Sequence, residues 1–308
     1  MSSFSQQIIS FFIQEGVTKI RFTGGEPTIY PHLTELVAFT RATAERNDVP
    51  LSIHLTTNGL TLGGRSATKL QELASAGLNG VNISLDSLIP SRFEALTRRK
   101  GHDHVLRCLE HSLQIGLQTK LNCVVMRGRN DDELVNFVDL TRDKPIDVRF
   151  IEFMPFDHND WRQDTVVSFN EMRARIEMER PEFVAVEGDE HRIARMFHVQ
   201  GYRGRVGFIS SITQAFCDSC TRVRVTADGK LKACLLDSSE VDLKPVLRSL
   251  PPEATPPNVM NTINNASECE NDALRSLVRQ ALSKKKLRHA DAEEMKMQIN
   301  RPMVAIGG

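Results

Sequence analysis

The sequence predicts an α/β protein whose strands form a parallel sheet or barrel with helices between them. The first observation is spacing, because β-rich stretches begin about 30–37 residues apart through the first half of the chain. The second is that apolar residues recur at helical spacing between these stretches. The third is size, since 308 residues suffice for two domains or for one α/β barrel.

The predicted elements follow in order from their local patterns. Apolar positions on one helical face predict a helix over 5–15, which Gly16 ends. The same pattern predicts three further helices, which span 31–46, 66–76 and 102–115. β-Branched and aromatic residues predict the strands, which span 17–23, 50–57, 81–85, 117–126 and 147–153. In such folds, chemistry collects at the carboxyl ends of the strands.

In the middle of the chain, the elements are predicted from isolated local motifs instead of from the regular alternation. The acids at 131–133 predict the first turn of a helix, where the helix dipole favours negative charge. Ser168 and Glu171 form a capping-box pattern, which predicts another helix start. Short strands are expected over 183–211, so the simple strand–helix repeat stops near residue 155.

The last third of the chain predicts a hairpin and a polar tail. Asp228-Gly229, flanked by alternating residues, predicts a β-hairpin over 221–233. Residues 250–270 are rich in Pro, Asn and Glu and predict a mobile loop, and a polar tail is expected from Lys284 onward. We therefore expect two regions, which span 1–155 and 156–308.

Composition excludes several classes of protein. Lys plus Arg and Asp plus Glu each total 39, so the chain lacks the basic excess of a general nucleic-acid binder. No apolar run reaches about 18 residues, so no membrane-spanning helix is predicted. The first residues lack the basic region and the small-residue cleavage site of a signal peptide. A balanced charge remains compatible with a local basic pocket for an anionic small molecule.

Three of the six cysteines lie close together in the sequence, which indicates a metal or cluster site. Cys217, Cys220 and Cys234 are spaced Cys-x₂-Cys-x₁₃-Cys, and the predicted hairpin folds the third back toward the first two. Thiolates suit zinc or an iron–sulfur cluster, and spacing alone favours neither. A zinc site would take a fourth ligand such as His198 or Cys269. A redox pair of the first two is the third alternative.

Basic residues occupy alternate positions on two predicted strands. Arg222 and Arg224 point to one face beside the cysteines, and two guanidinium groups on one face suit a phosphate. The alternative is a solvated edge strand. Lys19 and Arg21 also share a face, and a buried basic pair would require an anion. Lys120 is a further candidate, with a snorkelling side chain as the alternative.

Other candidate residues follow the predicted strands. Gly24-Gly-Glu-Pro27 allows close backbone approach to a ligand, and Glu26 offers a carboxylate for an ammonium group. An ordinary tight turn is the alternative. Asp86 is expected to accept a hydrogen bond or to cap a helix. Cys108 and Cys123 lack ligand-like spacing and are expected to be buried apolar thiols.

Six motifs together resemble one family over nearly the whole chain. The motifs are Lys19-Ile-Arg-Phe-Thr-Gly-Gly-Glu-Pro27, Thr56-Thr-Asn-Gly59, Asn82-Ile-Ser-Leu-Asp86, Arg149-Phe-Ile-Glu-Phe-Met154, Phe216-Cys-Asp-Ser-Cys-Thr-Arg-Val-Arg224 and Gly307-Gly308. In this order they resemble the GTP 3′,8-cyclases, which are radical S-adenosylmethionine enzymes of the first step of molybdenum cofactor synthesis. Gly-Gly-Glu-Pro alone would indicate only the radical superfamily.

The resemblance implies a fold and a set of site residues. The fold is an incomplete (β/α)6 TIM-like barrel, here without its first strand, and a C-terminal α+β region that carries an auxiliary [4Fe–4S] cluster. The implied cluster ligands are Cys217, Cys220 and Cys234. The implied GTP contacts are Arg21, Thr57, Lys120, Arg222, Val223 and Arg224. The implied S-adenosylmethionine contacts are Gly25, Glu26, Ser84 and Met154. The implied catalytic residues are Arg222, Arg224, Gly307 and Gly308, the last two reaching into the active site.

The resemblance also implies a reaction and partners. In the family, a 5′-deoxyadenosyl radical abstracts a ribose hydrogen of GTP, and the sugar carbon then attacks C8 of guanine. The product is (8S)-3′,8-cyclo-7,8-dihydroguanosine 5′-triphosphate, and cyclic pyranopterin monophosphate synthase is the downstream enzyme. We expect no nucleic-acid or membrane partner, a homodimer as one possible assembly, and the cytoplasm or the mitochondrial matrix as compartment.

The sequence departs from the family in one major respect, besides a short insertion near Gly63-Gly64 and the long loop at 250–270. Family members carry a Cys-x₃-Cys-x₂-Cys loop for the cluster that cleaves S-adenosylmethionine, and none of the six cysteines has this spacing. We expect an N-terminally truncated chain, whether fragment, gene-model error or isoform, which is inactive alone. The full-length protein would carry the N-terminal [4Fe–4S] cluster. The rival hypotheses are a non-catalytic iron–sulfur or zinc binding protein and another radical enzyme with an auxiliary cluster.

Overall fold

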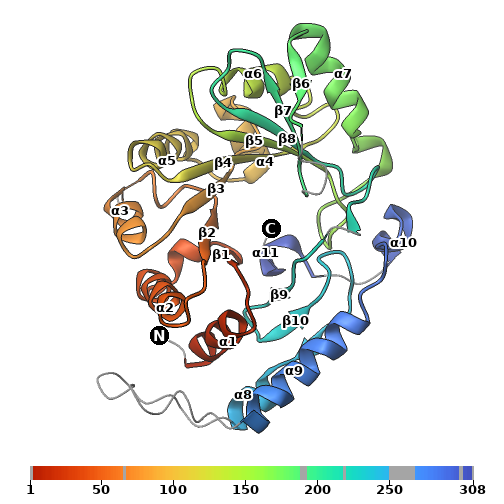
Figure 1. Cartoon of the computed structure of the whole chain (residues 1–308). Helices are drawn as coiled ribbons and strands as arrows, with labels where there is room; N and C mark the ends of the chain where they lie inside the picture. The colour runs from red at the N-terminus through yellow and green to blue at the C-terminus, as the bar shows by residue number, and fades with distance from the viewer. Residues whose placement is uncertain are drawn as a thin grey trace.

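The computed structural model describes residues 3–64, 67–187, 193–217, 220–249, 268–297 and 301–306. Over these residues the strands form two sheets, an eight-stranded sheet in the order β1-β2-β3-β4-β5-β8-β7-β6 and a three-stranded sheet in the order β11-β10-β9. Figure 1 shows the large sheet as a curved wall with helices on its outer side, while the small sheet and the C-terminal helices complete a ring.

The large sheet is mostly parallel, as the strand–helix alternation predicts. Its parallel strands are β1 (Lys19–Phe22), β2 (Ser52–Thr57), β3 (Gly80–Ser84), β4 (Gln118–Val125), β5 (Asp147–Glu152) and β8 (Arg205–Ile209). The antiparallel strands β7 (Arg195–Val199) and β6 (Phe183–Ala185) extend it. The five strands predicted before residue 155 are confirmed, and the sheet continues beyond that residue because β8 pairs with β5.

Helices connect these strands along the outer wall of the ring. They are α1 (Ser3–Gln14), α2 (Leu33–Arg46), α3 (Ala67–Ser75), α4 (Pro90–Thr97), α5 (His102–Gln114), α6 (Leu134–Asp139) and α7 (Phe169–Glu179). Gly77 follows α3 with φ 108°, and a Cβ there would lie 2.8 Å from Cγ of Arg41. Only glycine fits this helix end without strain. The capping box of Ser168 and Glu171 is present at the start of α7.

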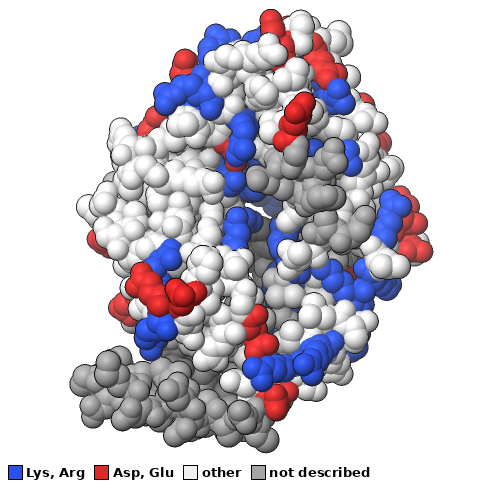
Figure 2. Space-filling view, viewed as in Figure 1, with Lys and Arg blue, Asp and Glu red and all other residues white. Residues whose placement is uncertain are grey.

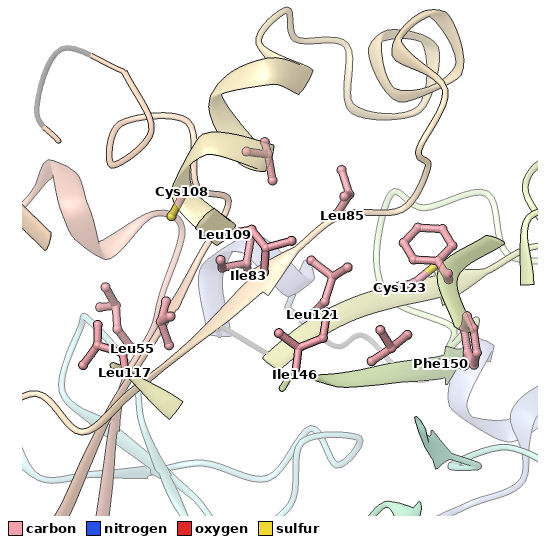
Figure 3. Close-up of a cluster of buried hydrophobic side chains, with 14 of the residues drawn as sticks. Leu55, Ile83, Leu85, Cys108, Leu109, Leu117, Leu121, Cys123, Ile146 and Phe150 are labelled. Carbon is pink, nitrogen blue, oxygen red and sulfur yellow. The ribbon is translucent and has the colours of Figure 1, made fainter. Parts of the chain in front are cut away.

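The main core lies between the sheet and these helices. Side chains alternate along each strand, so one face of the sheet is apolar and packs against the helices. Figure 3 shows part of this core, in which Leu55, Ile83, Leu121 and Phe150 from four strands pack together. Cys108 and Cys123 belong to the same cluster, which confirms them as buried thiols. Burial raises the pKa of Cys108 to about 12, so it stays a neutral thiol.

The C-terminal part forms a second, smaller core against α1. Its elements are β9 (Arg224–Val225), β10 (Lys230–Lys232), β11 (Val241–Asp242), α8 (Lys244–Ser249), α9 (Glu268–Ser283), α10 (Ala292–Met297) and α11 (Met303–Ile306). The predicted hairpin is confirmed, since β9 and β10 are antiparallel and Gly229 has φ 77° in the turn. Ile8 and Phe11 of α1 pack against Leu231 and Leu274, which joins the two ends of the described chain.

Three sequence expectations differ in detail from the structure. The loop predicted over 250–270 overlaps α9 from Glu268, and its remainder, 250–267, lies outside the described residues. The tail expected to be merely polar contains α10 and α11. The acids at 131–133 precede α6, whose first turn is not acidic. The physical reason is that the carboxylate of Glu133 is buried and paired with Arg92, instead of facing the helix dipole.

Candidate active site

The inner face of the large sheet carries polar and basic side chains where the outer face is apolar. Arg21 of β1 lies in register with His54 of β2, and Arg149 of β5 lies in register with Asn122 of β4. We use the name basic chamber for this face together with the arginines that follow Cys220, and its cations are Lys19, Arg21, Lys120, Arg149, Arg222 and Arg224. Figure 2 shows Lys and Arg side chains around the central hollow of the ring.

The cations of the basic chamber lower one another's proton affinity. Burial lowers the pKa of Arg149 to about 9 and that of Arg21 to about 10, and neighbouring arginines add to both shifts. Lys19 has its pKa lowered to about 8 by burial and by the same positive neighbours. The Nε atoms of Arg21 and Arg222 are buried without a hydrogen-bond partner. Arg149 donates a hydrogen bond to Asn122 at 2.9 Å. Crowded like charges and buried donors without a partner are costly, so this arrangement fits an anionic ligand.

One cation of the basic chamber is neutralised within the protein. Lys120 Nζ lies 2.7 Å from Asp147 Oδ2, and Arg205 donates two hydrogen bonds to the same carboxylate. Lys120 therefore does not snorkel to solvent but faces the ring as half of an ion pair. Asp147 holds it in place while adding negative charge beside the predicted anion site.

His54 is a neutral member of the basic chamber. Its ring is buried, Nε2 lies 2.8 Å from Ser52 Oγ, and Nδ1 has no hydrogen-bond partner. Burial and the surrounding positive charges lower the pKa of His54 to about 3 from an ordinary 6.5. Between these values the unfolded chain binds a proton that the folded chain does not, so stability falls as pH drops through this window.

We expect His54→Gln to reduce the loss of folding stability at acid pH. The wild-type free energy of unfolding should fall by at least about 1 kcal/mol more than that of the variant between pH 6.5 and 4.5. Urea titrations at both pH values measure the difference. His32→Gln, at an exposed histidine, is the matched control and should behave as wild type. Equal pH slopes for His54→Gln and wild type would contradict a buried neutral imidazole.

The Gly24-Gly-Glu-Pro27 segment is fixed by the carboxylate of Glu26. Oε1 accepts hydrogen bonds from the Thr28 backbone N–H, the Thr28 hydroxyl and the Thr57 hydroxyl, and Oε2 accepts one from the Asn58 backbone N–H. Glu26 thus joins the loop after β1 to the loop after β2. Only Oε2 has an acceptor position left for the ammonium contact that the resemblance implies. The hydroxyl of Thr57, an expected GTP contact, is engaged with Glu26 and with the N–H of Gly59.

Glu26→Gln should destabilise the chain by about 1–3 kcal/mol, because an amide NH₂ would then face donors. Chemical denaturation followed by circular dichroism measures this loss. Glu35→Gln, at an exposed position of α2, is the matched control and should change stability by less than about 0.5 kcal/mol. A Glu26 variant as stable as the control would show that the four hydrogen bonds do not fix the two loops.

The residues implied in S-adenosylmethionine binding lie at one edge of the sheet. Gly25 follows β1 and is exposed, Ser84 ends β3 and is exposed, and Met154 follows β5 and is half-buried. Parallel strands bring their carboxyl ends to the same edge, so these three positions share a rim of the ring. The structure thus groups them, while their contacts to a ligand stay a prediction.

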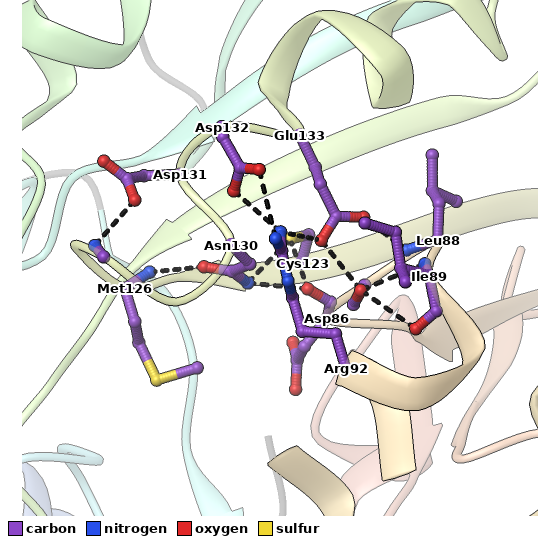
Figure 4. A network of polar contacts seen from close by, with 12 residues as sticks. Asp86, Leu88, Ile89, Arg92, Cys123, Met126, Asn130, Asp131, Asp132 and Glu133 are labelled. Carbon is purple, nitrogen blue, oxygen red and sulfur yellow. Dashed lines mark hydrogen bonds and ion pairs between the residues drawn. The ribbon is translucent and has the colours of Figure 1, made fainter. Parts of the chain in front are cut away.

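A polar network supports this rim behind Ser84 (Figure 4). Asn130 donates to the backbone oxygens of Asp86 and Val124, and Glu133 accepts hydrogen bonds from Ser87, the backbone of Leu88 and Arg92. Asp86 accepts a hydrogen bond from the Val124 backbone N–H, as expected of an acceptor at a strand end. Burial raises the pKa of Asp86 to about 6. The network ties the segment after β3 to the segment after β4.

The cysteine segment lies beside the basic chamber. Cys217, Cys220 and Cys234 form no disulfide and are partly exposed, and Cys220 and Cys234 lie close to Arg222 and Arg224. Burial raises the pKa of Cys220, but the N–H of Arg222 and nearby positive charges outweigh it and leave that pKa below its ordinary value. Within the described residues no three His, Cys, Asp or Glu side chains converge as a single-ion site.

A cavity of about 360 Å³ opens next to the first cysteine. It is lined by Thr213, Gln214, Ala215, Cys217, Leu287 and Arg288. Lys285 donates a hydrogen bond to the backbone oxygen of Cys220, so the segment after α9 packs against the cysteines. Residues Gly307 and Gly308, expected in the active site, lie outside the described residues.

Sequence reasoning missed two members of the basic chamber. Arg149 belongs to one of the six family motifs, but no role was predicted for it, and no role was predicted for His54. Each alternates with apolar residues on its strand, which is the signal of an inner-face position. That signal becomes specific only when the strand order brings Arg21, His54 and Arg149 to one face.

Comparisons with known proteins show the fold class. The model of the Radical SAM superfamily matches residues 6–141, and that of Molybdenum Cofactor Synthesis C matches residues 146–291. The solved structure of native anSMEcpe with bound AdoMet has a TM-score of 0.55 and 16% identity, over 79% of this chain and 68% of that one. Streptococcus suis SuiB has a TM-score of 0.55 and 13% identity, over 77% of this chain and 54% of that one. At these identities the likeness shows the fold, a radical SAM α/β fold. No helix of the described residues is long and apolar enough to cross a membrane.

Curated relatives are more similar in sequence. The mitochondrial GTP 3′,8-cyclase of Arabidopsis thaliana is 40% identical over 304 residues, or 98% of this chain and 71% of that protein. The GTP 3′,8-cyclase of Alkaliphilus metalliredigens is 40% identical over 250 residues, or 80% of this chain and 74% of that protein. Molybdenum cofactor biosynthesis protein 1 of Bos taurus is 41% identical over 296 residues, and the chain spans only 43% of its length. The chain therefore belongs to the GTP 3′,8-cyclase family.

Proposed function

We propose that this chain binds GTP in the basic chamber and carries the substrate half of a GTP 3′,8-cyclase. The observation that supports the proposal most is the cluster of cations, most of them half-buried, in which Arg21 and Arg222 each have a buried Nε atom without a hydrogen-bond partner. Arg224 lies close enough to both for their charges to lower its pKa to about 10, after burial. A triphosphate would relieve this repulsion and satisfy the unpartnered donors.

The residues of the chain divide the task of holding GTP. Lys19, Arg21 and Arg149 would neutralise the triphosphate from the sheet, and Lys120 would join them from its ion pair with Asp147. Arg222, Val223 and Arg224 would hold the nucleotide from the opposite wall, next to the cysteines. Contacts to GTP from both sides of the basic chamber would fix the ribose relative to the base. Ring closure between the ribose and the base requires this fixed orientation.

The three thiols fit an iron–sulfur cluster in their chemistry. Cys217, Cys220 and Cys234 would ligate one [4Fe–4S] cluster, and Arg222 and Arg224 would offset its negative charge. When bound, such a cluster has one iron without a cysteine ligand, which supplies a coordination position for the guanine. Within the described part of the chain, no three His, Cys, Asp or Glu side chains converge on a single ion, which favours this cluster over one zinc ion.

S-adenosylmethionine would bind at the strand-end rim formed by Gly25, Ser84 and Met154, with Glu26 beside its amino group. It supplies the radical that removes a ribose hydrogen, and the product is the cyclised dihydroguanosine triphosphate that the downstream synthase uses. The N-terminal cluster that would activate it has no ligand set among the six cysteines of this chain. We further propose that the curved sheet is an incomplete (β/α)6 barrel, with 1–155 as its radical SAM part and 156–308 as the cluster and GTP part.

An anaerobic assay tests the proposal. The chain with its cluster loaded, supplied with S-adenosylmethionine, GTP and dithionite, should form no 5′-deoxyadenosine. The same chain joined behind the Cys-x₃-Cys-x₂-Cys segment of the Arabidopsis relative should form 5′-deoxyadenosine and the cyclised nucleotide. In that complete enzyme, Arg224→Ala should lose nucleotide cyclisation and weaken GTP binding about ten- to a hundredfold. Turnover by the chain alone, or full cyclisation by Arg224→Ala, would refute the assigned roles.

A further inference from the structure

Arg301 joins the C-terminal segment to the β9–β10 hairpin. Arg301 donates two hydrogen bonds to Asp228, from Nη1 to Oδ1 at 2.9 Å and from Nη2 to Oδ2 at 2.8 Å. It also pairs with both oxygens of Glu240, from Nη2 at 2.8 Å and from Nε at 2.6 Å. These contacts join residues that are 61 and 73 positions apart in the chain.

Both carboxylates are themselves held in place. Asp228 lies in the hairpin turn and accepts a hydrogen bond from the Thr226 hydroxyl at 2.6 Å. Glu240 lies before β11 and pairs with Lys230 at 3.2 Å. The Arg301 guanidinium, with the Thr226 hydroxyl, holds the pKa of Asp228 well below its usual range. An isolated surface pair contributes little, but a bidentate contact within a network of fixed partners is stronger.

The segment that follows Arg301 includes the short helix α11, which needs contacts with the rest of the protein to stay folded. α11 has four residues, and so short a helix is not stable by itself in water. Figure 1 places α11 inside the ring, between the large sheet and β9. Ile306 is 3% exposed, so the far end of α11 is buried there. Arg301 at one end and Ile306 at the other therefore fix the segment within the ring.

We propose that Arg301 is a positioning residue, which with Asp228 and Glu240 fixes the C-terminal segment inside the ring beside the basic chamber. The segment then borders the space in which GTP is proposed to bind. Loss of the anchor would free the segment and remove one wall of that space. The effect on GTP rests on the proposed function, whereas the anchoring of the segment does not.

Hydrogen exchange measured by mass spectrometry on the full chain tests the anchor. In Arg301→Ala, the C-terminal peptide that begins at residue 301 should exchange at least about tenfold faster, while peptides of β4 stay unchanged. Arg301→Lys should restore part of the protection. Asp228→Asn should act in the same direction and add little to Arg301→Ala, because the two residues form one contact. Arg279→Ala, at an exposed arginine of α9, is the control and should leave the C-terminal peptide unchanged.

GTP titration of the cluster-loaded variants tests the consequence. Arg301→Ala should weaken GTP binding about tenfold with the same melting temperature, and Arg301→Lys should recover part of it. Unchanged exchange of the C-terminal peptide would overturn the anchor whatever GTP does. Faster exchange with unchanged GTP affinity would overturn the positioning role. No GTP binding by the wild type would refute the proposed function instead, and the exchange result would still decide the anchor. Faster exchange of β4 in Arg301→Ala would mean that this variant unfolds more widely. In that case the exchange of Asp228→Asn alone tests the anchor.

Discussion

Arg21→Met is expected to stabilise the chain without GTP by about 1–3 kcal/mol. The same substitution should weaken GTP binding, because it removes a charge that the proposed function needs. Arg21 lies on the inner face of β1, its Nε is buried without a partner, and burial together with Arg222 lowers its pKa to about 10. The folded chain therefore pays for a charge that the unfolded chain leaves in water. Methionine fills a similar volume without that charge, and the neighbouring arginines repel one another less.

Thermal and urea unfolding without nucleotide measure this gain. Arg279→Met at an exposed position of α9 is the matched control and should change the free energy of unfolding by less than about 0.5 kcal/mol. Functional sites commonly trade stability in this way, because a site prepared for a ligand is strained without it. Destabilisation of Arg21→Met by more than the control would show that Arg21 has a structural partner and that the chamber is not prepared for an anion.

Replacing Cys217, Cys220 or Cys234 by alanine should abolish cluster assembly. Only these three cysteines lie together in sequence, and Cys220 and Cys234 lie close to Arg222 and Arg224. A three-thiolate cluster that loses one ligand leaves two irons without cysteine and is expected to be lost. The measurement is iron and sulfide content after anaerobic reconstitution, with the visible absorbance of the cluster.

Cys108→Ala and Cys123→Ala are the matched controls, because both thiols are buried in the main core. They should reconstitute as wild type does, with some loss of stability. One zinc and no iron in anaerobically purified wild type would contradict the cluster and favour the structural zinc alternative. A cluster that survives in Cys234→Ala would contradict the assignment of the third ligand.

The parallel strands could be predicted from the sequence because each is a short apolar stretch between helical patterns. Residue types at their carboxyl ends also pointed to the Gly24-Gly-Glu-Pro27 loop and to Asp86. The basic chamber could be predicted only in part. Lys19 and Arg21 share a face within one strand, but their proximity to Arg149 depends on strand order and on the curvature of the sheet.

Other features depended on tertiary contacts that local patterns do not carry. The apolar residues of α9 recur at helical spacing, at Leu274, Leu277, Val278 and Ala281. The charged residues between them made this spacing hard to recognise in the sequence. The acids before α6 were read as dipole partners, but Glu133 pairs with Arg92, which is 41 positions earlier. Glu26 was read as a ligand group, and its four hydrogen bonds to Thr28, Thr57 and Asn58 require two loops to meet.

Equilibrium binding of GTP to the cluster-loaded chain is the most direct test of the claim that the basic chamber is a triphosphate site. We predict one GTP bound per chain, displaced by inorganic triphosphate. Affinity should fall about ten- to a hundredfold in Arg21→Met and in Arg224→Ala, because each removes one charge-assisted contact. Arg279→Met should bind as wild type does. Undiminished GTP binding by both chamber variants, or none by the wild type with its cluster intact, would contradict the account.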